Sequence, residues 1–339
     1  MRDMAREPVI ICLTPVRNES WILDRFLRCA SLWADHIIIA DQGSTDGSRE
    51  IASRFPKVML VENQSHEFSE AVRQRLLLDT ARSIEGPRLL IALDADEIFT
   101  SNLLVSDEWN KLLRQKTGTV IKLQLANVLP NMKSYWAPDI FFAWGFVDDG
   151  SKLAAERIHS VRVPVPYGAP IFHLNEIKVL HYQYTDWNRM KSKHRWYQCW
   201  ERINNTSRHA IDTYRQYHHM YAIPETDMHE LPPQWFAGYE ARSIDMTTVV
   251  KERLYWWDEE VLKYFNAHGT RRFRQEAIWD VDWDDIACSY SLDHSRHDLF
   301  SDPRTLFEKG VHYWLEKTQP ISERYYVRFV DAILKKIGW

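Results

Sequence analysis

The sequence is short of three features that would each indicate a class of protein. Its four cysteines lie far apart and form no CxxC pair, which argues against a zinc ribbon or a disulfide framework and favours a reducing compartment. Lys and Arg total 43 against 47 Asp and Glu, so the net charge of -4 provides no overall positive field for nucleic acid. No window approaches the ~18 apolar residues of a membrane span.

The N-terminus also lacks the core of a signal peptide. The apolar run in MRDMAREPVIICLTP is about six residues long, whereas a signal peptide core needs roughly 7 to 15. We therefore expect a cytoplasmic protein without a transmembrane segment. The sequence leaves open a peripheral contact with the inner face of the membrane and a homo-oligomer.

The N-terminal part of the chain alternates between short apolar runs and amphipathic segments. The runs are rich in β-branched residues and are predicted to be buried strands, while the segments between them show helical spacing of apolar residues. The predicted strands cover residues 9–14, 36–41, 58–63 and 89–93, and the predicted helices cover 18–33, 49–55 and 69–83. Strands joined by single helices pair in parallel through right-handed crossovers. The sequence therefore predicts an α/β fold with an open, mostly parallel sheet flanked by helices.

The alternation weakens after Asn102. Short strand-like runs broken by Gly and Pro follow, and from residue 186 the chain becomes helical and charged. We predict a first domain over residues 1–235 and a helical C-terminal region over 236–339. The basic, aromatic segment KSKHRWYQCWER is predicted to be an amphipathic helix, with contact to a diphosphate, an anionic acceptor or a membrane as the alternative.

The run LLIALDADE places carboxylates directly after a predicted buried strand. Polar segments also follow the first and second strands, as TPVRNE and DQGSTDGS. Ligands of open α/β sheets bind beyond the carboxyl ends of the strands, so these three segments are expected to meet in one crevice. Two Asp separated by one residue can share a hard divalent cation with phosphate oxygens. The three segments together favour a metal and phosphate site over a solvated acidic loop.

These segments resemble the successive blocks of family-2 glycosyltransferases, which are inverting nucleotide-sugar enzymes of GT-A fold. The matching stretches, in chain order, are TPVRNESWILDRFL, IIIADQGSTDGS, FSEAVRQRLLLDTAR and LLIALDADE. The resemblance implies metal-dependent transfer of a sugar, with inversion, from a nucleoside diphosphate sugar to a saccharide or glycolipid acceptor. It favours a UDP-sugar as donor and implies a role in bacterial surface polysaccharide assembly.

The resemblance also implies roles for residues of the first two blocks. Asp41 would read the base of the nucleotide. The sequence has DQG where the family has DDG, so Gln42 stands in place of a carboxylate. The residues that would line the nucleotide pocket are Thr14, Pro15, Arg17 and Glu19.

The third and fourth blocks supply the phosphate and metal residues that the resemblance implies. Arg73 matches the Arg of the third block, and Arg75 is the alternative because the block carries one extra residue. Asp94 would face the ribose with Ala95 beside it, and Asp96 would ligate Mn²⁺ or Mg²⁺. The resemblance assigns no separate role to Glu97, which we expect only to support Asp94 and Asp96.

A late histidine and a distal carboxylate complete the predicted site. By the resemblance, His181 would be a further metal ligand, and His173 is the alternative. Inversion requires a carboxylate that takes the proton of the acceptor hydroxyl. Asp149 is the predicted base, with Asp148 and Glu156 as alternatives.

Two other functions are compatible with parts of the sequence. A nucleotidyltransferase also uses acidic strand ends and Mg²⁺, but it would be expected to carry a Gly-rich loop after the first strand, and TPVRNE contains no glycine. A non-catalytic carbohydrate-binding relative would keep the fold. The presence of both Asp94 and Asp96 argues against that relative.

Overall fold

The computed structural model describes residues 7–63, 69–156, 160–290 and 300–339. The chain forms two compact units, each composed of two segments. Unit 1 comprises Met1–Thr185 and His229–Val250, and unit 2 comprises Asp186–Met228 and Lys251–Trp339. The boundary predicted at residues 235 and 236 therefore falls within the second segment of unit 1.

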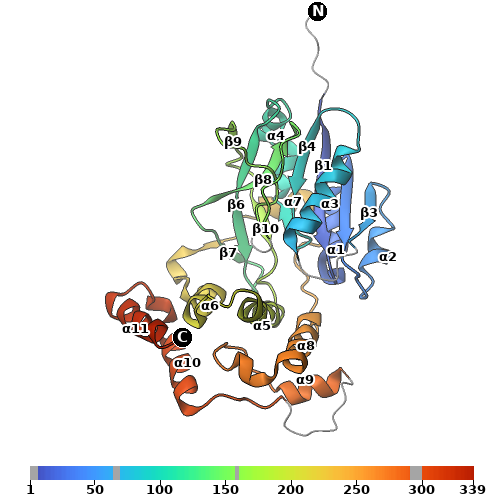
Figure 1. Ribbon diagram of the computed structural model, residues 1–339. Helices are drawn as coiled ribbons and strands as arrows, with labels where there is room; N and C mark the ends of the chain where they lie inside the picture. The colour runs from blue at the N-terminus through green and yellow to red at the C-terminus, as the bar shows by residue number, and fades with distance from the viewer. Residues whose placement is uncertain (1–6, 64–68, 157–159, 291–299) are drawn as a thin grey trace, which may run out of the picture. The chain divides into compact units, whose positions relative to one another are not determined.

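The first half of unit 1 alternates strands and helices. The elements are β1 (Val9–Val16), α1 (Ser20–Ala30), β2 (His36–Asp41), α2 (Ser48–Ala52), β3 (Val58–Glu62), α3 (Glu70–Arg82) and β4 (Arg88–Ala92). Strands β4, β1, β2 and β3 lie side by side in that order and pair in parallel (Figure 1). The predicted open α/β sheet flanked by helices is confirmed.

Both faces of this parallel sheet are covered by helices. Successive side chains of a strand point to opposite faces. Ile10 and Cys12 of β1 therefore belong to one buried core with the inner side of α1, whereas Ile11 and Leu13 belong to a second core with the inner side of α3. Burial on both faces explains why the strands read as near-continuous apolar runs in the sequence.

The second half of unit 1 extends the sheet with strands of both directions. The elements are β5 (Glu97–Phe99), η1 (Ser101–Val105), α4 (Asp107–Leu112), β6 (Val120–Val128), β7 (Ser134–Trp136), β8 (Phe141–Val147), β9 (Ile171–His173) and β10 (Val179–His181). Strand β8 is antiparallel to both β4 and β6, so β6 runs in the same direction as β4. Strand β10 lies between β5 and β6.

The segment 229–250 returns to unit 1 far along the chain. It continues β11 (Met228–Glu230) into α7 (Gln234–Glu240), which packs on η1. Gly238 N–H donates to Ser101 Oγ at 2.9 Å, and a Cβ at Gly238 would lie only 3.0 Å from that side chain. Glycine at position 238 therefore allows α7 to approach η1 closely.

Unit 2 is helical. Its elements are α5 (Trp187–Asn204), α6 (Ala210–Tyr217), η2 (His219–Ala222), η3 (Glu225–Asp227), α8 (Trp256–His268), η4 (Thr270–Phe273), α9 (Trp283–Ser289), α10 (Leu306–Thr318), η5 (Gln319–Ile321) and α11 (Tyr325–Lys336). The predicted helical character of the C-terminal part is confirmed. Across the described ranges, no helix is both long enough and apolar enough to cross a membrane.

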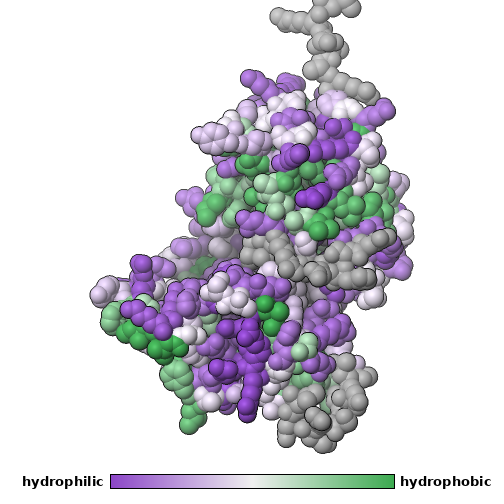
Figure 2. All heavy atoms as spheres, in the orientation of Figure 1, coloured by the Kyte–Doolittle hydropathy of each residue, from purple (hydrophilic) through white to green (hydrophobic). Residues whose placement is uncertain are grey.

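The last helix, α11, carries large apolar side chains on its exposed side. Its buried side holds Val327 and Asp331, and Asp331 is ion-paired with Arg215 at 3.0 Å. The exposed side holds the stripe Tyr326, Phe329, Ile333 and Ile337. Figure 2 shows apolar side chains gathered over α10 and α11. An apolar stripe of this kind on an exposed helix face indicates a contact surface.

Candidate active site

The carboxyl ends of β1, β2 and β4 meet at one edge of the sheet in unit 1. The strand register places Val16 opposite Asp41 and Leu13 opposite Ala92. The three polar segments that follow these strands therefore leave the sheet next to one another. This is the edge at which open α/β sheets bind ligands.

Hydrogen bonds tie the first two polar segments together. Asn18 N–H donates to Ser44 Oγ at 3.0 Å. Asp46 accepts from Ser20 N–H at 2.8 Å and from Ser48 Oγ at 2.7 Å. Burial acts to raise the pKa of Asp46, but these hydrogen bonds outweigh burial and lower it. Residues 44–48 therefore hold the two segments together by hydrogen bonds. Asp41, the first residue of DQGSTDGS, takes no part in these bonds and is the candidate for binding a ligand.

Asp41 is buried at the end of β2 with one carboxylate oxygen unused. Its Oδ2 accepts from Arg49 Nη1 at 3.0 Å and from Ser44 N–H at 3.3 Å. Its Oδ1 is buried and has no hydrogen-bond partner among the residues that the structure describes. An unsatisfied buried acceptor costs about 1–3 kcal/mol. The position therefore suits a group that brings an N–H or O–H donor.

The other residues predicted to line the nucleotide pocket differ in exposure. Thr14 is completely buried, so its side chain supports the edge from within. Pro15, Arg17 and Glu19 are half-buried. Glu19 Oε2 accepts from Trp21 Nε1 at 2.7 Å, which fixes the direction of this carboxylate. The structure brings all four residues to the same edge as Asp41, with three of them reaching the surface.

Asp94, Glu97 and Arg162 form a charged cluster at the end of β4. Arg162 Nη2 donates to Asp94 Oδ2 and to Glu97 Oε1, at 3.0 Å each, and Nη1 donates to Glu97 Oε2. Glu97 Oε2 also accepts from Asp94 N–H at 2.7 Å. The Arg162 guanidinium lies 4.5 Å from the centroid of the Trp144 ring. Glu97 therefore holds Asp94 in place through the Asp94 N–H and through Arg162. Arg162 is a residue of this edge that the sequence patterns did not predict.

Arg162 keeps its positive charge, and the cluster stays accessible. Burial acts to lower the pKa of the Arg162 guanidinium, but the charges of Asp94 and Glu97 outweigh burial and raise it. Burial also raises the pKa of Glu97, and the Arg162 charge opposes that rise. The side chains of Asp94 and Arg162 are 34% and 27% exposed. Both groups are therefore accessible to an incoming ligand, and Arg162 is the one with hydrogen-bond donors for a phosphate.

Asp96 and His181 come together because β10 lies between β5 and β6. His181 lies opposite Glu97 on one side and opposite Asn127 on the other. His181 Nδ1 lies 2.8 Å from Asn127 Oδ1, an acceptor, so Nδ1 carries the proton. His181 Nε2 then carries the lone pair of the ring and lies 3.8 Å from Asp96 Oδ2. This separation is too long for a hydrogen bond and suits two ligands of one cation.

This pair of donors fits a divalent cation that is shared with phosphate. Within the described ranges, no group of three or more His, Cys, Asp and Glu side chains could hold a metal ion by itself. Asp96 and His181 would hold Mn²⁺ or Mg²⁺ together with phosphate oxygens and water. The amide oxygen of Asn127 holds His181 as outer partners hold metal-ligating histidines.

The alternative histidine lies elsewhere. His173 pairs beside Lys122 of β6, whereas His181 pairs beside Asn127. Five residues of strand separate these two positions, which is roughly 16 Å. The structure therefore brings His181, and not His173, to Asp96.

Arg73 reaches the same edge from the first turns of α3. Its Nη2 lies 3.5 Å from Glu70 Oε1, and Glu70 Oε2 accepts from Ser160 N–H at 2.8 Å. Ser160 lies two residues before Arg162, so the start of α3 is joined to the segment that carries the charged cluster. Arg75 is exposed on α3.

Asp149 lies at the opposite edge of the sheet. The end of β8 runs beside the start of β4, and Asp148 N–H donates to Arg88 O at 2.9 Å. Six residues, or roughly 20 Å of extended chain, separate Arg88 from Asp94. A general base must lie within hydrogen-bond reach of the proton it takes. Asp149 therefore lies away from the carboxyl edge, because β8 runs antiparallel to β4.

The two alternative carboxylates are placed differently from each other. Asp148 is ion-paired with Arg82 at 2.7 Å and with Arg88 at 3.0 Å, at the same edge as Asp149. Glu156 N–H donates at 2.9 Å to the hydroxyl of Ser160, which lies close in the chain to Arg162. Glu156 is exposed. Of the three candidates, Glu156 is the one that the chain carries toward the carboxyl edge.

Comparisons with known proteins give likenesses of fold only. No family model and no curated protein matches the chain. One similar solved structure is glucosyl-3-phosphoglycerate synthase from Mycobacterium tuberculosis in complex with Mn²⁺, UDP and glucosyl-3-phosphoglycerate. It is 19% identical to this chain with a TM-score of 0.26, and the match covers 35% of this chain and 43% of that one. S. aureus TarS 1-349 is 15% identical with a TM-score of 0.28, over 34% and 36%. The match spans less than half of each relative.

A third solved structure is similar over more of its own length. The inositol-1-phosphate CTP transferase from T. maritima is 12% identical with a TM-score of 0.31, and the match covers 52% of this chain and 90% of that one. These structures include both a glycosyl transfer enzyme and a nucleotide transfer enzyme. The functional assignment therefore depends on the site in the chain itself.

Proposed function

We propose that unit 1 is a GT-A glycosyltransferase domain that transfers a sugar from a nucleoside diphosphate sugar, with inversion, and depends on Mn²⁺ or Mg²⁺. The observation that carries the proposal is the pair Asp96 and His181, held 3.8 Å apart at the carboxyl edge, with His181 oriented by Asn127. The resemblance of four sequence blocks to family-2 glycosyltransferases supports it.

The donor we propose is a UDP-sugar. The unused Oδ1 of Asp41 would accept a hydrogen bond from the base, and a uracil ring offers an imide N–H. Asp94 and the buried Ala95 would lie beside the ribose. The half-buried residues of the first loop would complete the nucleotide pocket.

The chain's own residues would hold the diphosphate and its cation. When bound, the cation neutralises charge on the leaving diphosphate. Asp96 and His181 would hold the cation, while Arg73 and Arg162 would donate to phosphate oxygens. We propose Glu156, in place of Asp149, as the carboxylate that takes the proton of the acceptor hydroxyl.

The acceptor we propose is a saccharide or a glycolipid, in bacterial surface polysaccharide assembly. The exposed stripe of α11 supports a peripheral membrane contact, because Arg324 and Arg328 are exposed beside Phe329 and Ile333. Sedimentation with anionic vesicles tests this contact. Phe329→Ser with Ile333→Ser should reduce binding, whereas Val105→Ser, an exposed apolar residue of unit 1, should not. If the wild type is a dimer and the double variant is a monomer, the stripe would instead be assigned to the interface of a homo-oligomer.

A turnover screen tests the proposed reaction. The full chain is incubated with a panel of nucleotide sugars and Mn²⁺, and release of nucleoside diphosphate is measured with and without EDTA. Release of UDP that EDTA abolishes is the expected result. Release of pyrophosphate from a nucleoside triphosphate and a sugar phosphate would support the nucleotidyltransferase alternative. No turnover, combined with no binding of UDP and Mn²⁺, would support a non-catalytic relative and overturn the proposal.

A further inference from the structure

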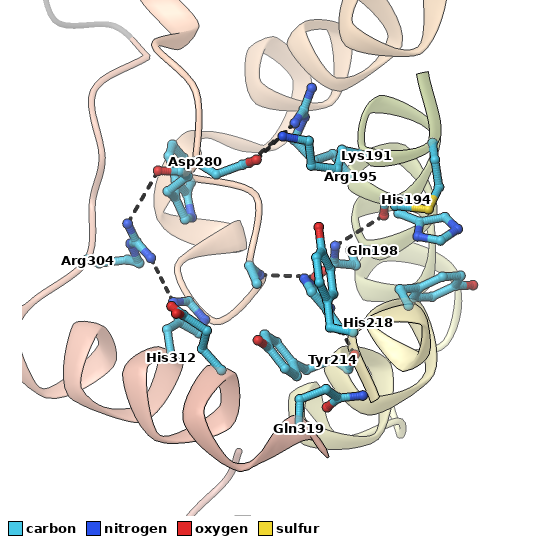
Figure 3. A pocket seen from close by; sticks show the side chains of 16 residues that line it. Lys191, His194, Arg195, Gln198, Tyr214, His218, Asp280, Arg304, His312 and Gln319 are labelled. Atoms are coloured by element: carbon cyan, nitrogen blue, oxygen red, sulfur yellow. Dashed lines mark hydrogen bonds and ion pairs between the residues drawn. The ribbon is translucent and has the colours of Figure 1, made fainter. Parts of the chain in front are cut away.

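Unit 2 contains a cavity of its own. Its volume is about 550 Å³, within the range of pockets that bind small molecules. The walls come from α5, α6, η2, the segment around residues 277–280, and α10. Figure 3 shows Arg195 and Gln198 of α5 on one side of the cavity, with Arg304 and His312 on the other. The chemistry proposed for unit 1 does not use this cavity.

Some polar groups of the wall make hydrogen bonds within the protein. Gln198 Oε1 accepts from Ala277 N–H at 3.1 Å, and its Nε2 donates to His194 O at 3.2 Å. His312 Nδ1 accepts from Arg304 at 2.9 Å, and its Nε2 donates to Gln275 O at 3.0 Å. These contacts fix the shape of the cavity without a ligand.

Other groups of the wall have hydrogen-bonding capacity left. His218 Nδ1 lies 2.9 Å from Tyr214 O, which only accepts, so Nδ1 carries the proton and Nε2 remains an acceptor. Burial lowers the pKa of His218 to about 4, so the ring is neutral near pH 7. Within the described part of the chain, His218 Nε2 and the hydroxyl of Tyr214 have no hydrogen-bond partner. The cavity therefore offers both an acceptor and a hydroxyl to a ligand.

Lys191 adds a cation to a cavity that is also lined by the carboxylates of Asp280 and Glu316. Arg195 is ion-paired with Asp258 at 3.1 Å and with Asp280 at 3.2 Å. Arg304 likewise has a carboxylate partner, in Asp302. Lys191 also lines the cavity, and among the described residues no carboxylate pairs with it. An anionic group on a ligand would complete this position.

Aromatic rings form a continuous part of the wall. The rings of Tyr214 and His218 stack with centroids 3.9 Å apart, and Tyr221 stacks on His218 at 5.9 Å. Trp279 also lines the cavity and is itself stacked on Phe265 at 5.3 Å. Amphipathic rings of this kind pack against apolar groups while polar groups remain within reach.

We propose that this cavity binds a saccharide, with a sugar acid bound more tightly than a neutral sugar. A sugar hydroxyl both donates and accepts, so it can donate to His218 Nε2 while a neighbouring hydroxyl accepts from Tyr214. The C–H groups of the ring pack against the aromatic wall. Lys191 binds the carboxylate. The inference does not depend on the reaction proposed for unit 1.

Calorimetric titration of the full chain tests the proposal, with glucose, N-acetylglucosamine and glucuronic acid as probes and UMP as comparison. Binding of glucuronic acid is expected to be strongest. His218→Phe keeps a stacked ring but removes the acceptor, and Tyr214→Phe removes the hydroxyl. Each should weaken binding about 3- to 10-fold, the effect of one hydrogen bond. His268→Phe, at an exposed histidine of α8, is the matched control and should leave affinity unchanged.

The outcomes separate this proposal from the one for unit 1. Lys191→Met should abolish the preference for glucuronic acid over glucose. Asp96→Asn should leave the sugar titration unchanged even though it removes metal-dependent nucleotide binding. No binding of any of the three sugars, or equal binding by wild type and His218→Phe, would overturn the proposal. Binding of UMP that His218→Phe abolishes would assign the cavity to a nucleotide and also overturn it.

Discussion

In the described part of unit 1, a cluster of carboxylates and arginines at the amino edge of the sheet and another at the carboxyl edge are built in opposite ways. At the amino edge, the Asp148 carboxylate accepts from Arg82 at 2.7 Å, from Arg88 at 3.0 Å and from Gly150 N–H at 3.0 Å. Its side chain has no exposed surface. Burial acts to raise the pKa of Asp148, but the hydrogen bonds outweigh burial and lower it. This cluster is complete in itself.

The cluster at the carboxyl edge is accessible. Arg162 is shared between Asp94 and Glu97, and about a quarter to a third of Arg162 and Asp94 is exposed. Beside it, Asp96 and His181 face each other without a hydrogen bond. The difference shows that residue types alone do not distinguish a structural ion pair from a ligand site. The exposed fraction of the side chains does.

The largest expected effect separates the two edges. Asp96→Asn should lower turnover of the nucleotide sugar by at least about 100-fold, because replacing even an outer partner of a metal ligand costs 10- to 100-fold. Asp149→Asn, a matched change at the amino edge, should change turnover by less than about two-fold. Initial rates at saturating Mn²⁺ measure both variants. A loss of turnover in Asp149→Asn would contradict the placement of the site.

The next effect tests whether the amino-edge cluster is structural. Asp148→Ala leaves two arginines without their acceptor, and breaking a buried ion pair costs about 3 kcal/mol. Urea unfolding should show that loss, while the affinity of the folded protein for UDP and Mn²⁺ should not change. Unchanged stability would mean that the cluster contributes nothing to the fold.

A smaller effect is expected from Asn127→Ala. This change removes the group that orients His181 and should weaken Mn²⁺ affinity about 10-fold, as for other outer partners of metal ligands. Gln124→Ala, at a half-buried residue of β6, serves as the control. Equal Mn²⁺ affinities for the two variants would argue against His181 as a ligand.

The smallest effect concerns pH. The folded pKa of Asp148 is below its ordinary value of 3.8, so its charged form contributes stability above that value, and the contribution is lost as pH falls through the folded pKa. The difference in unfolding free energy between wild type and Asp148→Asn should therefore stay constant from neutral pH down to about pH 4 and shrink below it. A difference that shrinks between neutral pH and pH 4 would contradict the lowered pKa.

The sequence predicts the first half of unit 1 well because local patterns determine it. Strands β1, β2, β3 and β4 are continuous apolar runs, and their ends carry Asp41, Asp94 and Asp96. The direction in which a distant strand enters the sheet cannot be predicted from local sequence patterns. Asp149 follows a strand-like run in the sequence, but β8 enters the sheet antiparallel to β4 and carries it to the other edge.

Two other features could not be predicted from local patterns. Arg162 lies in an irregular segment rich in valine and proline, 68 residues from Asp94, so nothing local connects the two. The segment 229–250 returns to unit 1 through contacts such as that of Gly238 with Ser101, 137 residues away. Both features follow from tertiary packing.

Titration of Mn²⁺ by electron paramagnetic resonance, with UDP present, tests the central claim most directly, because the signal of free Mn²⁺ falls as the ion binds. Wild type and Asp149→Asn are expected to bind Mn²⁺ equally, whereas Asp96→Asn and His181→Asn should lose binding. Circular dichroism confirms that each variant is folded. Binding of Mn²⁺ and UDP by Asp96→Asn with wild-type affinity would contradict a metal and nucleotide site at the carboxyl edge.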